Sequence, residues 1–426
     1  MTVTHVFCAL AILEGCAQAA YSQTSAPPQW AEAEQSADSL DEIDEVVKGF
    51  IDSEDLVGAV TLVYHRGQIV HWRAYGLADR ESKRPMEKNA ILRIHSFTKA
   101  ISTAAALMLF ESGKFQLDDP VEKYLPNFAD AQVYGEPNYT AAKRPMTVRD
   151  LMRHTSGLVY PNEDESPPAN LFTREEIFNT DGNLQTMADR LAEIPLKFSP
   201  GDDWCYGVSI DVLGRLIEVW SGQTYESFVR QQLLEPLGMV DTAFHVPPEK
   251  LARLATLYER EKEEGSDQWG PLQPRRGLER DRYYVPHSTP SFCMPGGGLF
   301  STAHDYLQFL RMILCRGELE GRRYLKPETV ALMTSDQLPS HIPNIHFDDV
   351  RDGLKCGLGF AVFIKPSQWD PTAKVGEFGW GGAASCHYWV YPPEELIVIT
   401  LESTMPYNWN LERGLKPLIY SAAAAD

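Results

Sequence analysis

Near the N-terminal end of the chain, the spacing of apolar residues changes from helical to strand-like. Apolar residues recur at helical spacing from 40 to 51, which predicts an amphipathic helix. The next segments, 57–64 and 69–75, are rich in β-branched and aromatic residues and flank the short polar stretch 65–68. This pattern is typical of two strands joined by a tight turn, so we expect a β-hairpin after the first helix.

Strand patterns return toward the C-terminal end of the chain. Residues 357–364, 386–391 and 396–401 each favour a strand. The Pro-Pro-Glu-Glu stretch 392–395 is expected to form the turn between the last two strands. A closing helix is predicted over 409–422, so strands and a covering helix occur at both ends of the chain.

Helical patterns broken by Pro- and Gly-rich loops fill the segment between these two regions. We therefore expect one antiparallel sheet built from both ends of the chain and covered by the first and last helices. The predicted organisation is an α/β (α+β) lobe formed by residues 39–116 and 281–426, with a mainly helical lobe, 117–280, inserted into it. A cleft between two such lobes is a natural substrate site.

Composition and charge limit the partners of the protein. The chain has 426 residues, 43% of them hydrophobic, so it can bury a full core. Its 39 Lys and Arg against 59 Asp and Glu give a formal net charge of −20. Such a surface repels phosphate backbones, so we expect no nucleic acid partner. Outside the N-terminal segment, no apolar stretch is long enough to span a bilayer, and the oligomeric state stays open.

The N-terminal segment leaves two localisations open. Residues 1–20 partly resemble a secretory signal, with an apolar stretch at 6–13 and small residues at 17–19, but no Lys or Arg precedes Lys48. Residues 21–38 have the composition of a linker. Export to the periplasm is expected if the segment acts as a signal, and a cytoplasmic location if it does not. The seven cysteines show no paired spacing, so a disulfide framework is not indicated.

One Ser-x-x-Lys motif, Ser96-Phe97-Thr98-Lys99, opens an apolar run over 100–110. If this run is a helix, Lys99 lies one turn after Ser96, at the helix end where the dipole favours negative charge. Lysine activates a serine only if its pKa falls from about 10.4 toward the working pH, or if a tyrosine shuttles the proton. Tyr206, just before the helical stretch 208–217, is a candidate for that tyrosine.

A glycine-rich stretch at 379–383 precedes the strand pattern over 386–391. Glycine lets backbone N–H groups approach a ligand closely, and an oxyanion hole needs two such donors, one of which could come from Ser96 itself. A tight turn at a sheet edge is the alternative interpretation. His341 and His346 flank a proline in a predicted loop, so no metal site is expected there.

Taken together and in this order, the three motifs resemble the serine β-lactamase and penicillin-binding-protein superfamily, and within it the family VIII carboxylesterases. Further similar stretches are 147–158, 236–239 and 296–302. The resemblance covers roughly residues 40–420 and implies a β-lactamase/DD-peptidase-like fold without a metal or organic cofactor. It also implies an acyl-enzyme mechanism, with Ser96 as nucleophile and Lys99 and Tyr206 as a coupled base. The backbone amides of Ser96 and Ala383 would form the oxyanion hole.

Two departures from the superfamily pattern concern substrate recognition. Where β-lactamases and peptidases carry Tyr-x-Asn, the third position is Val208, which cannot hydrogen-bond an amide. Where they carry Lys-Thr-Gly, this chain has Trp380-Gly381-Gly382 and lacks the cation that attracts a carboxylate. Both changes favour neutral esters with apolar parts. We expect these four residues, with His95 beside the nucleophile, to contact the substrate.

The sequence thus predicts a serine carboxylesterase that hydrolyses short-chain acyl esters, a small-molecule substrate, with weak β-lactam hydrolysis beside it. Alternatives within the superfamily are a β-lactamase, a D-aminopeptidase or an acyltransferase. An alternative from another class is a non-catalytic binding protein on the same fold. The joint presence of Ser96, Lys99 and Tyr206 argues against this last alternative.

Overall fold

The computed structural model describes most of the chain. The described residues are 40–135, 138–160, 167–178, 183–263, 265–266, 268–275, 292–347 and 349–425. The signal-like segment 1–20 and the linker 21–38 lie outside them, so both stay predictions. Over the described ranges, no helix is both long and apolar enough to cross a bilayer.

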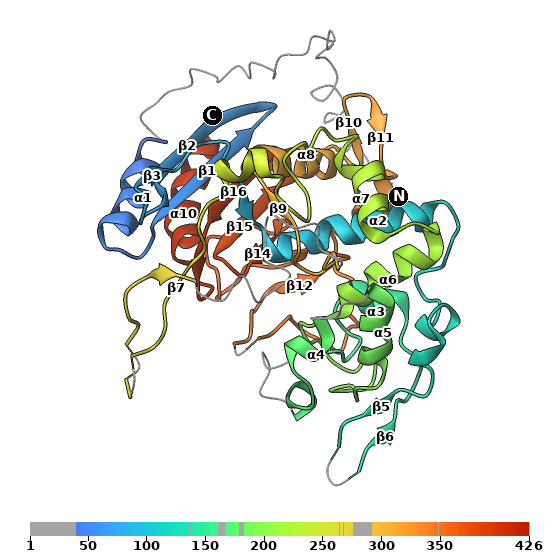
Figure 1. The fold of residues 1–426 in the computed structure, drawn as a ribbon. Coiled ribbons are helices and arrows are strands. Elements are labelled where there is room, and N and C mark those ends of the chain that lie inside the picture. Colours follow the sequence, from blue (N-terminus) through green and yellow to red (C-terminus); the bar gives the residue numbers. More distant parts are fainter. Residues whose placement is uncertain are drawn as a thin grey trace.

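Helices and strands share the two ends of the chain, and helices dominate its middle (Figure 1). The α-helices are α1 (Glu42–Asp52), α2 (Thr98–Glu111), α3 (Val148–Met152), α4 (Arg174–Phe178), α5 (Leu184–Ala192), α6 (Ser209–Ser221), α7 (Tyr225–Val229), α8 (Ala303–Leu314), α9 (Pro327–Met333) and α10 (Asn410–Ala425). Shorter helical turns are η2 (His95–Phe97), η3 (Val121–Lys123), η4 (Pro126–Phe128), η5 (Pro167–Asn170), η6 (Arg230–Leu234), η7 (Pro248–Arg253) and η8 (Pro392–Glu394). The strands are β1 (Gly58–His65), β2 (Gln68–Asp79), β3 (Arg84–Pro85), β4 (Leu92–Arg93), β5 (Gln132–Val133), β6 (Thr140–Ala141), β7 (Tyr258–Glu259), β8 (Gln273–Pro274), β9 (Phe300–Ser301), β10 (Glu318–Leu319), β11 (Arg322–Arg323), β12 (Leu354–Cys356), β13 (Ala361–Phe363), β14 (Phe378–Gly382), β15 (Cys386–Tyr391), β16 (Leu396–Glu402) and β17 (Thr404–Met405).

An eight-stranded antiparallel sheet joins the two ends of the chain, in the order β12-β13-β14-β15-β16-β1-β2-β3. The N-terminal hairpin β1–β2 meets the C-terminal hairpin β15–β16 through the pair β1–β16, in which Val60 is opposite Leu401 and Leu62 is opposite Ile399. The predicted sheet from both ends is therefore confirmed. The predicted turn at 392–395 is confirmed too, because η8 connects β15 to β16.

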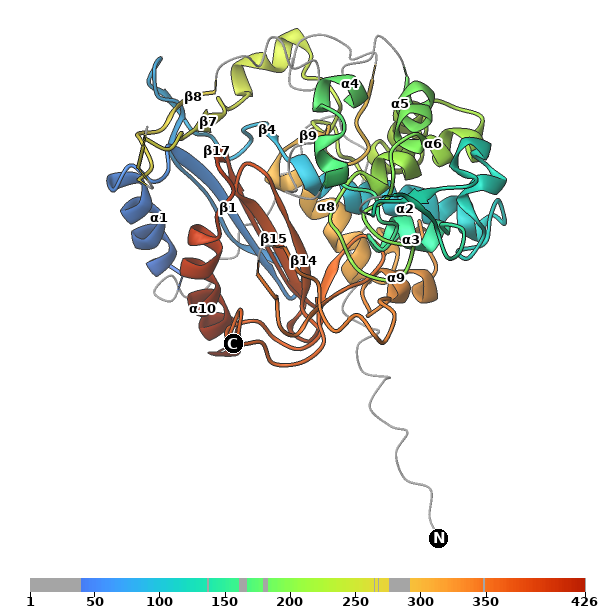
Figure 2. The ribbon, with the colours of Figure 1, turned by 90° about the horizontal axis from the view of Figure 1, so that it is seen from below.

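Helices cover both faces of this sheet (Figure 2). On one face, Ile43 and Val47 of α1 and Leu415 of α10 pack against Ala59 and Val398 of the central strands. On the other face lie α2 and α8, and α8 contacts β1 and β16. The first and last helices thus cover the sheet as predicted, and the larger core lies on the opposite face with α2.

Helix α2 lies between the sheet and the helical middle of the chain. It packs against α6, which in turn contacts α3 and α5. Most residues of α2, including polar ones such as Thr98, Ser102 and Thr103, are buried. A helix that is buried on all sides needs the mostly apolar composition of this segment. The division of the chain at residues 116 and 280 stays a prediction.

Only the second half of the strand predicted over 357–364 is present. Strand β13 covers 361–363, and residues 357–360 form the turn that joins it to β12. The turn needs Gly359, which has φ of 90°, and a Cβ there would lie 2.9 Å from Thr103 of α2. Leu358 and Phe360 in the turn are fully buried, so their apolar side chains imitate a strand pattern.

Candidate active site

Ser96 lies in the turn η2, directly before α2. The preceding residue, His95, has φ of 45°, a left-handed conformation that residues other than glycine rarely adopt. Two hydrogen bonds hold this turn: Thr98 Oγ1 donates to the carbonyl oxygen of His95 at 2.6 Å, and the Tyr306 hydroxyl donates to that of Phe97 at 3.0 Å. The serine is therefore fixed at the N-terminal end of α2.

The Lys99 ammonium lies next to the serine and is buried. Its Nζ donates to Ser96 Oγ at 3.1 Å, to the Tyr160 hydroxyl at 2.9 Å and to the carbonyl oxygen of Gly296 at 2.6 Å. Three acceptors match the three protons of an ammonium. The ring of Tyr206 lies 4.6 Å from Nζ, so the positive charge also faces an aromatic ring.

Tyr206 makes the second polar contact to the nucleophile. Its hydroxyl donates to Ser96 Oγ at 2.6 Å, so Lys99 and Tyr206 meet at the same oxygen. His154 packs on the Tyr206 ring, with centroids 5.0 Å apart. Burial, and then the Lys99 ammonium, lower the pKa of His154 to about 3, so its imidazole is neutral at neutral pH. His154 therefore packs beside the site as a neutral, structural side chain.

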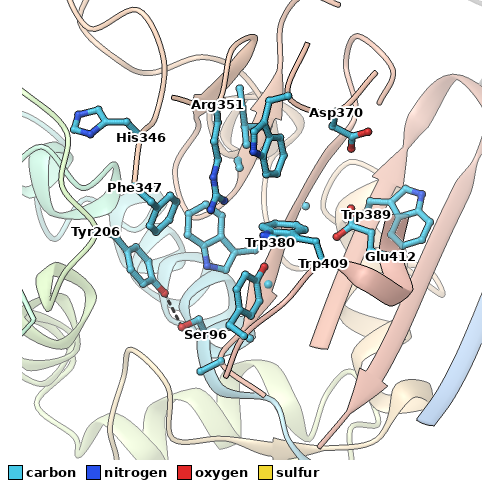
Figure 3. A pocket seen from close by; sticks show the side chains of 18 of the residues that line it. Ser96, Tyr206, His346, Phe347, Arg351, Asp370, Trp380, Trp389, Trp409 and Glu412 are labelled. Atoms are coloured by element: carbon cyan, nitrogen blue, oxygen red, sulfur yellow. Dashed lines mark hydrogen bonds between the residues drawn. The ribbon is translucent and has the colours of Figure 1, made fainter. Parts of the chain in front are cut away.

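A cavity of about 840 Å³ opens beside Ser96 (Figure 3). Its lining is dominated by aromatic rings, from Trp204, Tyr206, Phe347, Trp369, Trp380, Trp389, Tyr407 and Trp409. Cavities of this size are typical of small-molecule sites. The aromatic walls suit the apolar parts of an ester, and the polar atoms around Ser96 lie at one end.

The glycine-rich stretch forms strand β14 up to Gly382, and only 383–385 form a turn. Strand β13 pairs with just the first two residues of β14, Phe378 and Gly379, whereas β15 pairs along its whole length. The later part of β14 lies against η2. A Cβ at Gly382 would lie 2.6 Å from the carbonyl oxygen of Ile94, so glycine permits this close approach. Ala383 follows directly and lines the cavity with Ser96.

The structure separates the predicted site residues into two groups. Ser96, Tyr206, Trp380, Gly381, Gly382 and Ala383 line the cavity, and Lys99 contacts Ser96 from behind it. Val208 and His95 are buried and do not line the cavity. Both side chains therefore lie outside the cavity lining, and their expected contacts with a substrate stay predictions. Val208 belongs to the hydrophobic core, where its position before α6 places it.

Sequence reasoning missed most of the aromatic lining, and with it two cavity residues that carry polar groups, Tyr160 and Arg351. Tyr160 follows the stretch 147–158 that carried part of the family resemblance, and this proximity is the one signal that could have singled it out among 18 tyrosines. Arg351 lies in a loop before β12 with no motif around it. Its place in the cavity depends on tertiary packing alone.

No metal-ligating cluster of His, Cys, Asp or Glu occurs in the described part of the chain. His341 and His346 instead contact single oxygen atoms, the carbonyl of Gly201 at 2.9 Å and the carboxylate of Asp203 at 3.1 Å. The five cysteines of the described ranges, Cys205, Cys293, Cys315, Cys356 and Cys386, are free thiols.

A family model described as "Beta-lactamase" matches residues 43–416. The chain belongs to the β-lactamase family. This β-lactamase-family chain is 32% identical over 371 residues to an uncharacterized protein of Mycobacterium tuberculosis, covering 84% of this chain and 89% of that protein. It is 31% identical over 373 residues to "Esterase EstB" of Burkholderia gladioli, covering 82% of this chain and 86% of that protein.

Among solved structures, the β-lactamase-family fold of this chain resembles "EstCE1, a hydrolase with promiscuous acyltransferase activity". The TM-score is 0.75 at 26% identity, over 90% of this chain and 99% of that chain. The predicted fold class and superfamily are thus confirmed, including the nearness to carboxylesterases. The protein is a serine-hydrolase-type enzyme of this family.

Replacing Tyr160 by phenylalanine is expected to lower kcat of this β-lactamase-family enzyme about tenfold or more. The change removes one of three acceptors of the Lys99 ammonium, and a hydrogen bond to a charged group is worth roughly 1.5–3 kcal/mol. Initial rates on a nitrophenyl ester measure the effect. Tyr225→Phe is a matched control, because it removes another buried hydroxyl that contacts α2, at Ser102. An equal reduction of kcat in Tyr160→Phe and Tyr225→Phe would contradict a specific effect on Lys99.

Proposed function

We propose that the protein is a carboxylesterase that hydrolyses short-chain acyl esters through an acyl-Ser96 intermediate. The observation that carries this proposal is the convergence of two groups on one oxygen: Lys99 Nζ at 3.1 Å and the Tyr206 hydroxyl at 2.6 Å from Ser96 Oγ. Both groups can hold or pass the serine proton, as a nucleophilic serine requires. EstB, named an esterase, supports ester hydrolysis over the other chemistries of the fold.

In the proposed acylation step, the Lys99–Tyr206 pair enters with one proton fewer, as a free amine or a phenolate, and takes the proton of the Ser96 hydroxyl while the serine oxygen attacks the ester carbonyl carbon. The carbonyl oxygen becomes an oxyanion, which we assign to the backbone N–H groups of Ser96 and Ala383. The same proton then passes to the departing alcohol as the ester C–O bond breaks. In deacylation, water replaces the alcohol and gives up its proton by the same route, which restores Ser96 and releases the acid.

The cavity supports short acyl groups and apolar alcohol parts. Its volume is about 840 Å³, within the range of pockets that hold small molecules. The aromatic rings around Tyr206, from Phe347 and Trp380, have centroids 5.6 and 5.4 Å from its own. These rings restrict the space beside the nucleophile to small or flat groups.

A second candidate is acyl transfer to an alcohol other than water. It uses the same acyl-Ser96 intermediate and differs only in the acceptor that enters the cavity. EstCE1, named a hydrolase with promiscuous acyltransferase activity, favours this candidate. Butyryl transfer to added alcohols, measured beside hydrolysis on one preparation, separates the two activities.

A substrate panel tests the proposed function. We expect kcat/KM for nitrophenyl butyrate to exceed that for nitrocefin and benzylpenicillin by about tenfold or more. The physical reason is that Val208 supplies no hydrogen bond for the amide of a β-lactam, and such a contact is worth roughly 1 kcal/mol or more. Dodecanoate esters should react more slowly than butyrate. A β-lactam that matches the ester would favour a β-lactamase instead.

A further inference from the structure

Arg351 presents a cation to the cavity at a distance from the nucleophile. In Figure 3 its side chain points into the cavity from the side opposite Ser96. Three aromatic rings hold the guanidinium: its central carbon lies 4.0 Å from the centroid of Phe347, 4.7 Å from that of Trp369 and 5.1 Å from that of Trp409. The side chain is only 11% exposed, so the cation is fixed and largely desolvated.

The guanidinium has more donors than the protein uses. Arg351 Nε donates to Asp349 Oδ1 at 3.4 Å, and among the described residues this is its one hydrogen-bond acceptor. Asp349 is itself half-exposed and held by the indole N–H of Trp369 at 2.7 Å. Because a guanidinium carries five N–H donors in a planar fork, the two Nη groups are left for a ligand. Burial lowers the pKa of Arg351, as expected for a cation whose charge is offset by few nearby acceptors.

The acidic side chains of the cavity do not compensate this cation. Asp370, Glu377 and Glu412 also line it, but all three bind the buried Lys416 ammonium, at 2.7, 2.6 and 3.0 Å. Burial raises the pKa of Glu377 and of Glu412, which favours their neutral forms, so the Lys416 ammonium mainly offsets Asp370, whose pKa is lowered. An anion that enters the cavity meets the open fork of Arg351 instead.

We propose that Arg351 binds a carboxylate of the substrate, so that the ester substrates of this enzyme carry an anionic group in addition to the ester that is cleaved. Phe347 links the two ends of the site: it packs on the guanidinium and on the ring of Tyr206, whose hydroxyl contacts Ser96. A substrate with its ester at Ser96 thus extends toward Arg351. This inference rests on the proposed function and replaces the expectation of neutral esters, because Arg351 supplies the cation that Trp380-Gly381-Gly382 lacks.

Two matched ester pairs test the proposal and show which part of the substrate carries the carboxylate. The acyl pair is phenyl hydrogen glutarate and its carboxamide analogue. The alcohol pair is the butyrate esters of hydroxybenzoic acid and hydroxybenzamide. We expect the wild-type enzyme to prefer the carboxylate member of one pair about tenfold or more in kcat/KM, although the protein has a net charge of −20.

Arg351→Gln should remove this preference by lowering kcat/KM for the carboxylate ester about 10- to 100-fold, with less than threefold change for the carboxamide ester. Retained activity on the carboxamide ester shows that the variant is folded. Arg413→Gln is the matched control, because its guanidinium also packs on Trp369, at 5.2 Å, but does not line the cavity. This control should keep the wild-type preference.

Two outcomes would overturn the proposal: no carboxylate preference in either pair for the wild type, or an equal loss on both esters in Arg351→Gln. The wild-type ratio is informative even if the variant does not fold. If the wild type hydrolyses none of the four esters, the proposed function fails rather than the role of Arg351. Calorimetric binding of phenyl hydrogen glutarate and its carboxamide analogue to Ser96→Ala then tests the carboxylate site by itself.

Discussion

Replacing Ser96 by alanine is expected to lower ester hydrolysis by about 10⁴-fold or more, while the fold stays intact. Removal of a serine nucleophile in enzymes of this type leaves only the small rate enhancement from binding and the oxyanion hole. The Ser96 Oγ accepts hydrogen bonds from Lys99 and Tyr206 but takes no part in the core, so its loss costs little stability. Steady-state rates on nitrophenyl butyrate and thermal unfolding measure the two effects.

Mass spectrometry after a short substrate pulse adds a positive test. The acyl group should appear on the peptide that contains Ser96, and a fluorophosphonate should label the same peptide. Ser102→Ala serves as the matched control, because this serine lies on the same helix but binds Tyr225 and the carbonyl oxygen of Pro295. An acyl group on another serine would show that the nucleophile is assigned wrongly. The absence of any label would favour the non-catalytic alternative.

Lys99→Ala and Tyr206→Phe are each expected to lower kcat by about 10³-fold or more, and the double variant little more than the worse single one. Residues that act on one proton as a unit are strongly non-additive. The structure motivates this expectation because both groups contact the same oxygen, at 3.1 and 2.6 Å. A double-mutant cycle in kcat, with the pH dependence of each variant, measures the coupling.

The cycle needs a comparison in which the two groups do not share a proton. Combining Lys99→Ala with Tyr225→Phe provides it, because Tyr225 contacts α2 through Ser102 and not through Ser96. For that pair, the fold-reduction in kcat of the double variant should equal the product of the two single reductions. If the losses of Lys99→Ala and Tyr206→Phe multiply as well, the two groups act independently and the coupled base is disproved.

Much of the fold could be predicted because its strands and outer helices follow local patterns. β1 and β16 consist mostly of β-branched and apolar residues, and α1 buries one apolar stripe, so each element carries its own sequence signal. Ser96 and Lys99 could be paired because they lie one turn apart. The turn at 357–360 was not predicted because it is buried. Its residues are apolar because they lie in the core, and this composition is the same as that of a strand.

The remainder of the site depends on contacts between distant segments. Tyr160 is 61 residues from Lys99, and no local spacing relates the two. Val208 illustrates the opposite case, since its position in a motif suggested a substrate contact while its side chain lies in the core. Motifs indicate which chain segments meet at a site. Which side chains then face the cavity is settled by packing.

The groups that surround Ser96 come from widely separated parts of the chain. The Tyr206 hydroxyl is 110 residues away, and the Gly296 carbonyl that holds Lys99 is 197 residues from that lysine. None of these contacts can form in a partly folded chain in which only single helices or hairpins exist. Covalent labelling of Ser96 therefore counts the molecules that have completed tertiary assembly. In a preparation that mixes folded and misfolded protein, the labelled fraction measures the folded fraction.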